Sequence, residues 1–160
     1  MTEFRAVTPD FAVAAQILPA DMARAAAAGF KLVISNRPAG ESPDQPRDAE
    51  LRAAAADAGL EYRQIAFQGK PNPAIVAETA LALTEANGPV LGYCRTGTRS
   101  IMAWAMAQAM TGARRPDELL ALAAKAGYDL SGLGPVLATL APERLTLPES
   151  LLALLPPRPA

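Results

Sequence analysis

The chain has 160 residues and a formal net charge of −1. This length suits one compact domain with a substantial core, and a near-neutral charge argues against a nucleic-acid-binding protein, which needs a basic face. No stretch approaches the roughly 20 apolar residues that cross a bilayer, and the N-terminus lacks a signal peptide's charged start and apolar run. We therefore expect a cytoplasmic protein without a nucleic-acid or membrane partner, and homo-oligomer formation is left open.

The inventory of reactive side chains is short, because the chain has no histidine and one cysteine, Cys94. The absence of histidine removes the commonest general base and the commonest metal ligand, so we expect neither a metal nor a cofactor. A lone cysteine cannot form an internal disulfide, which suits a reducing compartment. Any chemistry must use Cys94, carboxylates, arginines, hydroxyls or backbone groups.

Helix-like runs, glycines and apolar strands alternate along the first part of the chain. Strands are predicted at "EFRAVT" (3–8) and "FAVAAQI" (11–17). A helix-like run, a glycine and an apolar strand then recur three times, with the glycines at Gly29, Gly59 and Gly88. Each glycine is predicted to be the left-handed cap that ends its helix. This alternation predicts an α/β fold with a mostly parallel central sheet.

Three further helices are predicted downstream, at 98–112, 116–127 and 130–141. The first of them, "TRSIMAWAMAQAMTG", is apolar nearly all round, which is typical of a buried helix. A proline-rich stretch follows the last of these helices at the end of the chain. We therefore divide the chain into a single α/β domain at 1–141 and a proline-rich C-terminal tail at 142–160.

Three segments are predicted to meet at one edge of the sheet. The loops at 37–46 and 67–73 are rich in turn residues and follow strands, and "YCRTGTRS" (93–100) also follows one. In open α/β sheets, ligands bind at the carboxyl ends of the strands. Residues 36–41, 67–73 and 94–100 should therefore converge on a common rim.

The segment "YCRTGTRS" combines a thiol with features that stabilise an anion. The following helix directs its positive end and unpaired N–H groups at Cys94, and Arg95 and Arg99 add positive charge, so the thiolate should be favoured. Gly97 lets successive N–H groups turn inward as an anion nest. Arg99 can hold an oxyanion through two parallel hydrogen bonds. A nucleophilic cysteine that attacks an anionic substrate follows from this arrangement.

Together with "GFKLVISNRPAGE" (29–41) and "AAAADAGLEYRQIAF" (53–67), this segment resembles the beta-lactamase-hydrolase-like protein, phosphatase-like domain family. The resemblance covers most of residues 5–135. That family is similar in fold to the tyrosine and dual-specificity phosphatases, which implies a tyrosine-phosphatase-like central sheet flanked by helices. It also implies that Cys94 is the nucleophile and Arg99 the anion clamp, with Asn36 and Arg37 near the same rim.

The expected site therefore has a catalytic pair and a set of substrate-binding residues around it. The catalytic pair is Cys94 and Arg99. The residues expected to bind the substrate, from the loop itself and from the end of the preceding strand, are Arg95, Thr96, Gly97, Thr98, Ser100, Asn36 and Arg37.

Two departures from the phosphatase pattern bear on the reaction. The phosphatase signature is H-C-x5-R, whereas here four residues separate Cys94 from Arg99 and Tyr93 replaces the histidine. A six-residue C-x-x-G-x-R-S loop resembles that of rhodaneses, which carry sulfane sulfur as a cysteine persulfide. Such phosphatases also need an acid on an upstream loop, but the equivalent "AFQGKPNP" (66–73) has no carboxylate. Glu41 and Asp44 could supply a remote acid, although solvated loop charges are the favoured interpretation for both.

These departures favour a rhodanese-type sulfurtransferase that moves sulfane sulfur through a Cys94 persulfide. An alcohol leaves poorly without an acid, whereas sulfite leaving thiosulfate needs none. A tyrosine or dual-specificity-like phosphatase acting through a Cys94 phosphocysteine is the first alternative. A non-catalytic anion-binding module is the second, because a lone cysteine at a strand end is more often inert. The expected partner is a small anion: thiosulfate, a persulfide or a phosphate ester.

Overall fold

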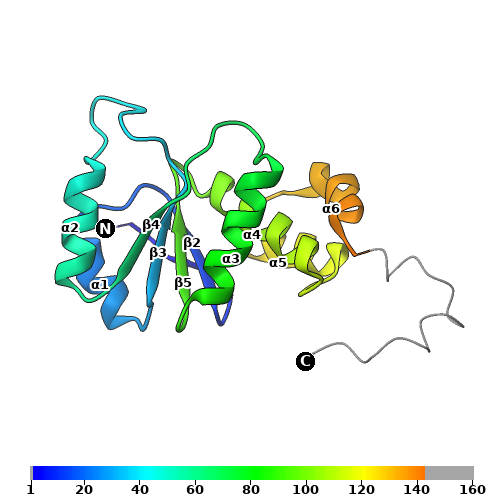
Figure 1. Ribbon diagram of the computed structural model, residues 1–160, viewed down its shortest axis with the longest axis horizontal. Coiled ribbons are helices and arrows are strands. Elements are labelled where there is room, and N and C mark those ends of the chain that lie inside the picture. Colours follow the sequence, from blue (N-terminus) through cyan, green and yellow to red (C-terminus); the bar gives the residue numbers. More distant parts are fainter. Residues whose placement is uncertain (1, 143–160) are drawn as a thin grey trace, which may run out of the picture.

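Five short strands form one sheet in the order β1-β2-β5-β3-β4. The computed structural model describes residues 2–142 (Figure 1). β1 is antiparallel to β2, and the other neighbouring strands are parallel, which confirms the predicted mostly parallel α/β fold. The strands are β1 Arg5–Thr8, β2 Phe11–Ala14, β3 Leu32–Ser35, β4 Glu61–Gln64 and β5 Val90–Tyr93.

The helices cover both faces of the sheet, as the resemblance implied. α1 and α2 lie on one face, and α3 and α4 lie on the other, with α5 and α6 packed against α4 (Figure 1). β5 is central, so the residues that follow it leave the middle of the sheet. The helices are α1 Asp21–Ala27, α2 Asp48–Asp57, α3 Pro73–Glu85, α4 Thr98–Thr111, α5 Pro116–Lys125, the 3-10 turn η1 Ser131–Leu133 and α6 Gly134–Leu140.

The core consists of two apolar clusters, one on each face of the sheet. Every residue of β2, β3 and β5 is buried, as expected for parallel strands covered on both sides. α4 is buried along most of its length, and its Trp104 stacks on Phe11 of β2 with ring centroids 5.1 Å apart. The apolar stripe of α4 is therefore core, and it fixes the position of the loop that precedes it.

Two of the three predicted glycine caps are confirmed, and the third is wrong. Gly29 and Gly59 adopt the left-handed conformation, with φ of 98° and 80°, but Gly88 does not have a positive φ. α3 ends at Glu85, because Ala86 already has an extended backbone with ψ of 136°. Gly88 serves close packing instead, since a Cβ there would lie 2.6 Å from Cγ of Lys31.

The helix predicted over 130–141 is divided into η1 and α6 at Gly134. Pro135 lies in the first turn of α6, where its missing N–H is tolerated, so it begins a new helix rather than continuing the old one. The tail predicted at 142–160 falls outside the described residues, apart from Pro142. Within residues 2–142, no helix has the length and apolar character needed to cross a membrane.

Candidate active site

The thiol of Cys94 lies immediately after the central strand and beneath the start of α4. Its side chain is buried, and its Sγ accepts a hydrogen bond of 3.1 Å from the Gly97 N–H. Gly97 is the N-cap of α4 and has φ of 95°, a conformation that glycine adopts at little cost. The sulfur therefore faces the positive end of a 14-residue helix, as the sequence predicted.

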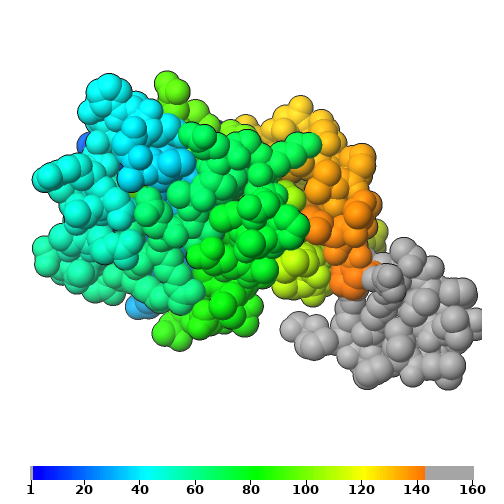
Figure 2. Space-filling view, turned by 45° about the horizontal axis from the view of Figure 1, so that its top comes forward, coloured from blue at the N-terminus to red at the C-terminus, as the bar shows by residue number. Residues whose placement is uncertain are grey.

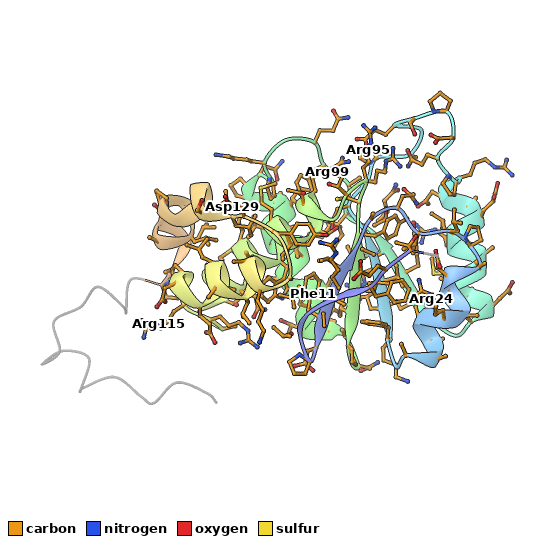
Figure 3. The ribbon with its side chains drawn as sticks, turned by 180° about the vertical axis from the view of Figure 1, so that it is seen from behind. Phe11, Arg24, Arg95, Arg99, Arg115 and Asp129 are labelled. Carbon is orange, nitrogen blue, oxygen red and sulfur yellow. The ribbon has the colours of Figure 1, made fainter. Side chains whose placement is uncertain are left out.

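Arg99 connects the Cys94 loop with the two other loops of the rim. Its Nη1 and Nη2 donate to the two carboxylate oxygens of Glu41, at 2.8 and 2.7 Å, and Nη1 also donates to the Phe67 carbonyl at 3.1 Å. These contacts confirm the predicted convergence of 36–41, 67–73 and 94–100. Figure 3 shows Arg99 and Arg95 near each other at one end of the sheet, with Phe11 toward the other end.

The Glu41 carboxylate is shared between Arg99 and Arg37. Arg37 is buried, and it donates from Nε to Glu41 Oε1 at 2.9 Å, from Nη1 to Gln16 Oε1 at 3.0 Å and from Nη2 to Ser42 Oγ at 3.1 Å. The hydrogen bonds from Arg99, and less strongly the one from Arg37, lower the pKa of Glu41 to about 2. Glu41 is therefore ionised at neutral pH and has no proton to give.

The expectation that Glu41 is a solvated loop charge is wrong. Its side chain is only 19% exposed, because the 37–46 loop folds back over the sheet edge. In Figure 2 the cyan surface around this loop borders the green surface of later segments of the chain. Asp44 is exposed and accepts a 2.6 Å hydrogen bond from Ser42 Oγ. The sequence offered one weak signal for Glu41, its position four residues after Arg37. That spacing predicts an ion pair only on a helix, and these residues are not helical.

The other expected binding residues of the loop differ in exposure. Thr96 and Thr98 are exposed, with their Oγ1 atoms 3.2 Å apart, whereas Ser100 is buried and its Oγ has no hydrogen-bond partner among residues 2–142. Arg95 is exposed and, together with Arg37, lines a pocket of about 330 Å³ beside the loop. The loop thus has one cationic side chain at its surface and one buried hydroxyl beneath it.

Asn36 is held by the backbone of the neighbouring strand. Its Nδ2 donates to the Ile65 carbonyl at 2.8 Å, and its own N–H donates to the Tyr93 carbonyl at 2.8 Å. These bonds join the ends of β3, β4 and β5 just below the rim. Asn36 thus lies near the rim, as expected, with its amide group donating to main chain.

Tyr93, which stands where phosphatases have histidine, points into the α1 and α2 face of the sheet. The Tyr93 hydroxyl lies 2.7 Å from the Tyr62 hydroxyl, and the Tyr62 hydroxyl donates to Asp48 Oδ1 at 2.8 Å. Burial raises the pKa of Tyr93, so its hydroxyl stays protonated. The pair therefore packs as neutral hydroxyls within the apolar cluster on the α1 and α2 face of the sheet.

The arrangement can hold and attack a small anion. It offers a sulfur that accepts an amide N–H, further N–H groups at the start of α4, and a guanidinium fixed by a carboxylate on its outer edge. Within the described part of the chain, no group of three or more cysteine, aspartate or glutamate side chains is placed to hold a metal.

Curated proteins match between 64% and 74% of this chain in sequence. The beta-lactamase hydrolase-like protein of Agrobacterium fabrum is 32% identical over 119 residues, which are 74% of this chain and 28% of that protein. The chain spans about a quarter of the length of the curated relatives it matches.

Solved structures of other proteins have a fold similar to that of this chain. The crystal structure of a "putative phosphatase" from Neisseria meningitidis has a TM-score of 0.74 and 28% identity, covering 84% of this chain and 96% of that one. Tk-PTP in its active form has a TM-score of 0.61 and 15% identity, covering 85% of this chain and 93% of that one, which shows a common tyrosine-phosphatase-like fold. The sequence pattern of one family matches residues 3–111, a span that includes every residue described in this section. The chain belongs to the beta-lactamase hydrolase-like protein, phosphatase-like domain family.

Proposed function

We propose that this member of a cysteine-type phosphatase-like family is a rhodanese-type sulfurtransferase, with Cys94 as the sulfur carrier and Arg99 as the anion clamp. The observation that carries the proposal is that the Glu41 carboxylate is ionised and paired with Arg99. It is the carboxylate bound to Arg99, and with a pKa of about 2 it cannot protonate a leaving alcohol at neutral pH. The loop at 66–73, where phosphatases hold an acid, has none.

The proposed reaction needs no acid in either half. The Cys94 thiolate attacks the outer sulfur of thiosulfate, the S–S bond breaks, and its electron pair leaves with sulfite. Cyanide or a thiolate acceptor then attacks the terminal sulfur of the Cys94 persulfide and restores the thiolate. The Gly97 N–H and the Arg99 guanidinium stabilise the negative charge throughout.

Phosphate ester hydrolysis is the second candidate, and the Neisseria meningitidis structure described as a phosphatase favours it. In that reaction the Gly97 N–H and the Arg99 guanidinium hold the phosphoryl group, and Cys94 becomes a phosphocysteine. Without an acid, the loss in rate is typically about 10²- to 10⁴-fold. Aryl esters, whose phenolate leaves more readily than an alkoxide, should therefore be hydrolysed weakly and phosphoserine still more weakly.

Both reactions should be measured side by side on one preparation. We expect thiosulfate:cyanide sulfur transfer, and an increase in intact mass of one sulfur atom after thiosulfate treatment. Because Cys94 is the chain's one cysteine, Cys94→Ser should abolish both signals. Efficient phosphoserine or phosphothreonine hydrolysis with no detectable persulfide would overturn the proposal in favour of a phosphatase. A thiol inert to alkylation at neutral pH would favour the anion-binding module.

A further inference from the structure

One peptide unit of the Cys94 loop is hydrogen-bonded at both ends. The N–H of Gly97 donates to Cys94 Sγ at 3.1 Å, and the carbonyl of Thr96, in the same peptide, accepts from the Tyr128 hydroxyl at 3.0 Å. A planar trans peptide directs its N–H and its carbonyl to opposite sides. The bond from Tyr128 and the bond to the sulfur therefore fix the same orientation.

This peptide needs such an anchor because Gly97 follows it. Glycine adopts positive and negative φ about equally well, so the plane between Thr96 and Gly97 can turn over at little steric cost. If it turned, the carbonyl oxygen would replace the N–H beside the sulfur, and a thiolate would be repelled. A hydrogen bond to the Thr96 carbonyl from outside the loop opposes this rotation.

Tyr128 is itself held firmly enough to act as the anchor. It follows α5, where its backbone N–H donates to the Ala123 carbonyl at 2.9 Å, and the Arg5 guanidinium lies 5.7 Å from its ring centroid. Its hydroxyl lies so close to Gly97 that a Cβ on that glycine would collide with it. Burial raises the pKa of Tyr128, so the hydroxyl stays protonated and donates.

We propose that Tyr128 is a positioning residue of the Cys94 site, which orients the Thr96–Gly97 peptide so that its N–H is directed at the sulfur. The inference rests on the proposed role of Cys94 as nucleophile, but it holds for sulfur or phosphoryl transfer alike. Tyr128 lies outside the 3–111 span that matches the family pattern, so the segment after α5 completes a site built on that span.

The test compares Tyr128→Phe with the parent by the pH profile of thiolate absorbance, after subtraction of the matching Cys94→Ser protein. The other groups nearest the sulfur, Arg99 and beyond it Glu41, stay unchanged. Loss of the anchoring bond should move the midpoint upward by about half to one pH unit, the effect of weakening one hydrogen bond to a charged group. Iodoacetamide alkylation at a pH below both midpoints should slow by about three- to tenfold.

Tyr62→Phe is the matched control, because it also removes one aromatic hydroxyl, but one bonded to Asp48 and Tyr93. It should lower thermal stability without moving the thiolate midpoint. An unshifted midpoint in Tyr128→Phe, or an equal shift in both variants, would show that Tyr128 has only a structural role. If the parent thiol is not alkylated at neutral pH and gains no sulfur from thiosulfate, the proposed function itself fails, whatever Tyr128→Phe shows.

Discussion

Arg99 combines two tasks that a lysine cannot perform together. One edge of its guanidinium is occupied by both oxygens of Glu41, and the Phe67 carbonyl accepts from the same Nη1. The pKa of Arg99 is raised, chiefly by the hydrogen bonds to Glu41 and also by its closeness to Cys94. The planar fork is therefore held in place on one side while it remains near the sulfur on the other.

Arg99→Lys should keep the fold and lose most of the activity. The ammonium retains the charge but cannot make the two parallel bonds to Glu41, so its position over the loop is no longer fixed. We expect the rate of the reaction that the parent catalyses to fall by about ten- to a hundredfold, the worth of one charge-assisted hydrogen bond.

Arg47→Lys is the control for that change, because Arg47 pairs with Glu50 at the surface and its side chain is 82% exposed. This variant should match the parent in rate. If Arg99→Lys also matches the parent, Arg99 is not the anion clamp, and Arg37 or Arg95 becomes the candidate.

At the scale of elements, the cap of α3 helps to order the rim. Asn72 ends the 66–72 segment that contains Phe67, and its side-chain oxygen accepts a hydrogen bond from the Ile75 N–H at 2.9 Å. Pro73 follows at the first helical position, where its fixed φ suits the helix. α3 in turn packs along α4, the helix that begins at the Cys94 loop.

Asn72→Ala should lower the free energy of unfolding by about 1 kcal/mol, because it removes the acceptor for an N–H at the helix start. The measurement is chemical denaturation at neutral pH. Arg115→Ala is a suitable control, since Arg115 is the N-cap of α5 but makes no side-chain capping bond there. Equal losses in the two variants would show that the Asn72 cap does not stabilise α3.

At the scale of the whole molecule, Glu41 links loops that follow three different strands. Its carboxylate binds Arg37 just after β3 and Arg99 after β5, and Arg99 also binds Phe67 after β4. The ordinary pKa of 4.5 falls to about 2 in the folded state. Between these two values the unfolded chain binds more protons than the folded one, so stability rises with pH.

The stabilisation from Glu41 should thus be complete above about pH 4.5 and be lost as the pH falls toward 2. Glu41→Gln should lower the melting temperature at pH 7 and flatten its dependence on pH in that window. Thermal unfolding followed from pH 2 to 7 measures both effects. Glu50→Gln, on the exposed face of α2, should retain the slope of the parent. A parental slope in Glu41→Gln would mean that the shared ion pair does not stabilise the fold.

Local sequence patterns determined most of the architecture. Short runs that follow a glycine predicted β3, β4 and β5, and α4 was predicted to be buried because it is apolar nearly all round. The chemistry of the loop from Cys94 to Ser100 could be predicted from that segment alone, since a strand, a glycine and a helix start place a thiol among N–H groups. Gly88 shows the limit of such patterns, because a glycine can serve close packing as well as a helix cap.

The sequence predicted that 36–41 and 67–73 approach that loop, but only the tertiary structure decided which residues contact it. Glu41 is 58 residues from Arg99, and Tyr128 is 32 residues from Thr96. No helical or strand period relates residues so far apart, so neither contact could be inferred from spacing. Each depends on how a segment outside the loop returns to it: 37–46 over the sheet edge, and Tyr128 at the end of α5. The sequence by itself therefore determined where a nucleophile could lie, and the folded chain decided which carboxylate and which hydroxyl surround it.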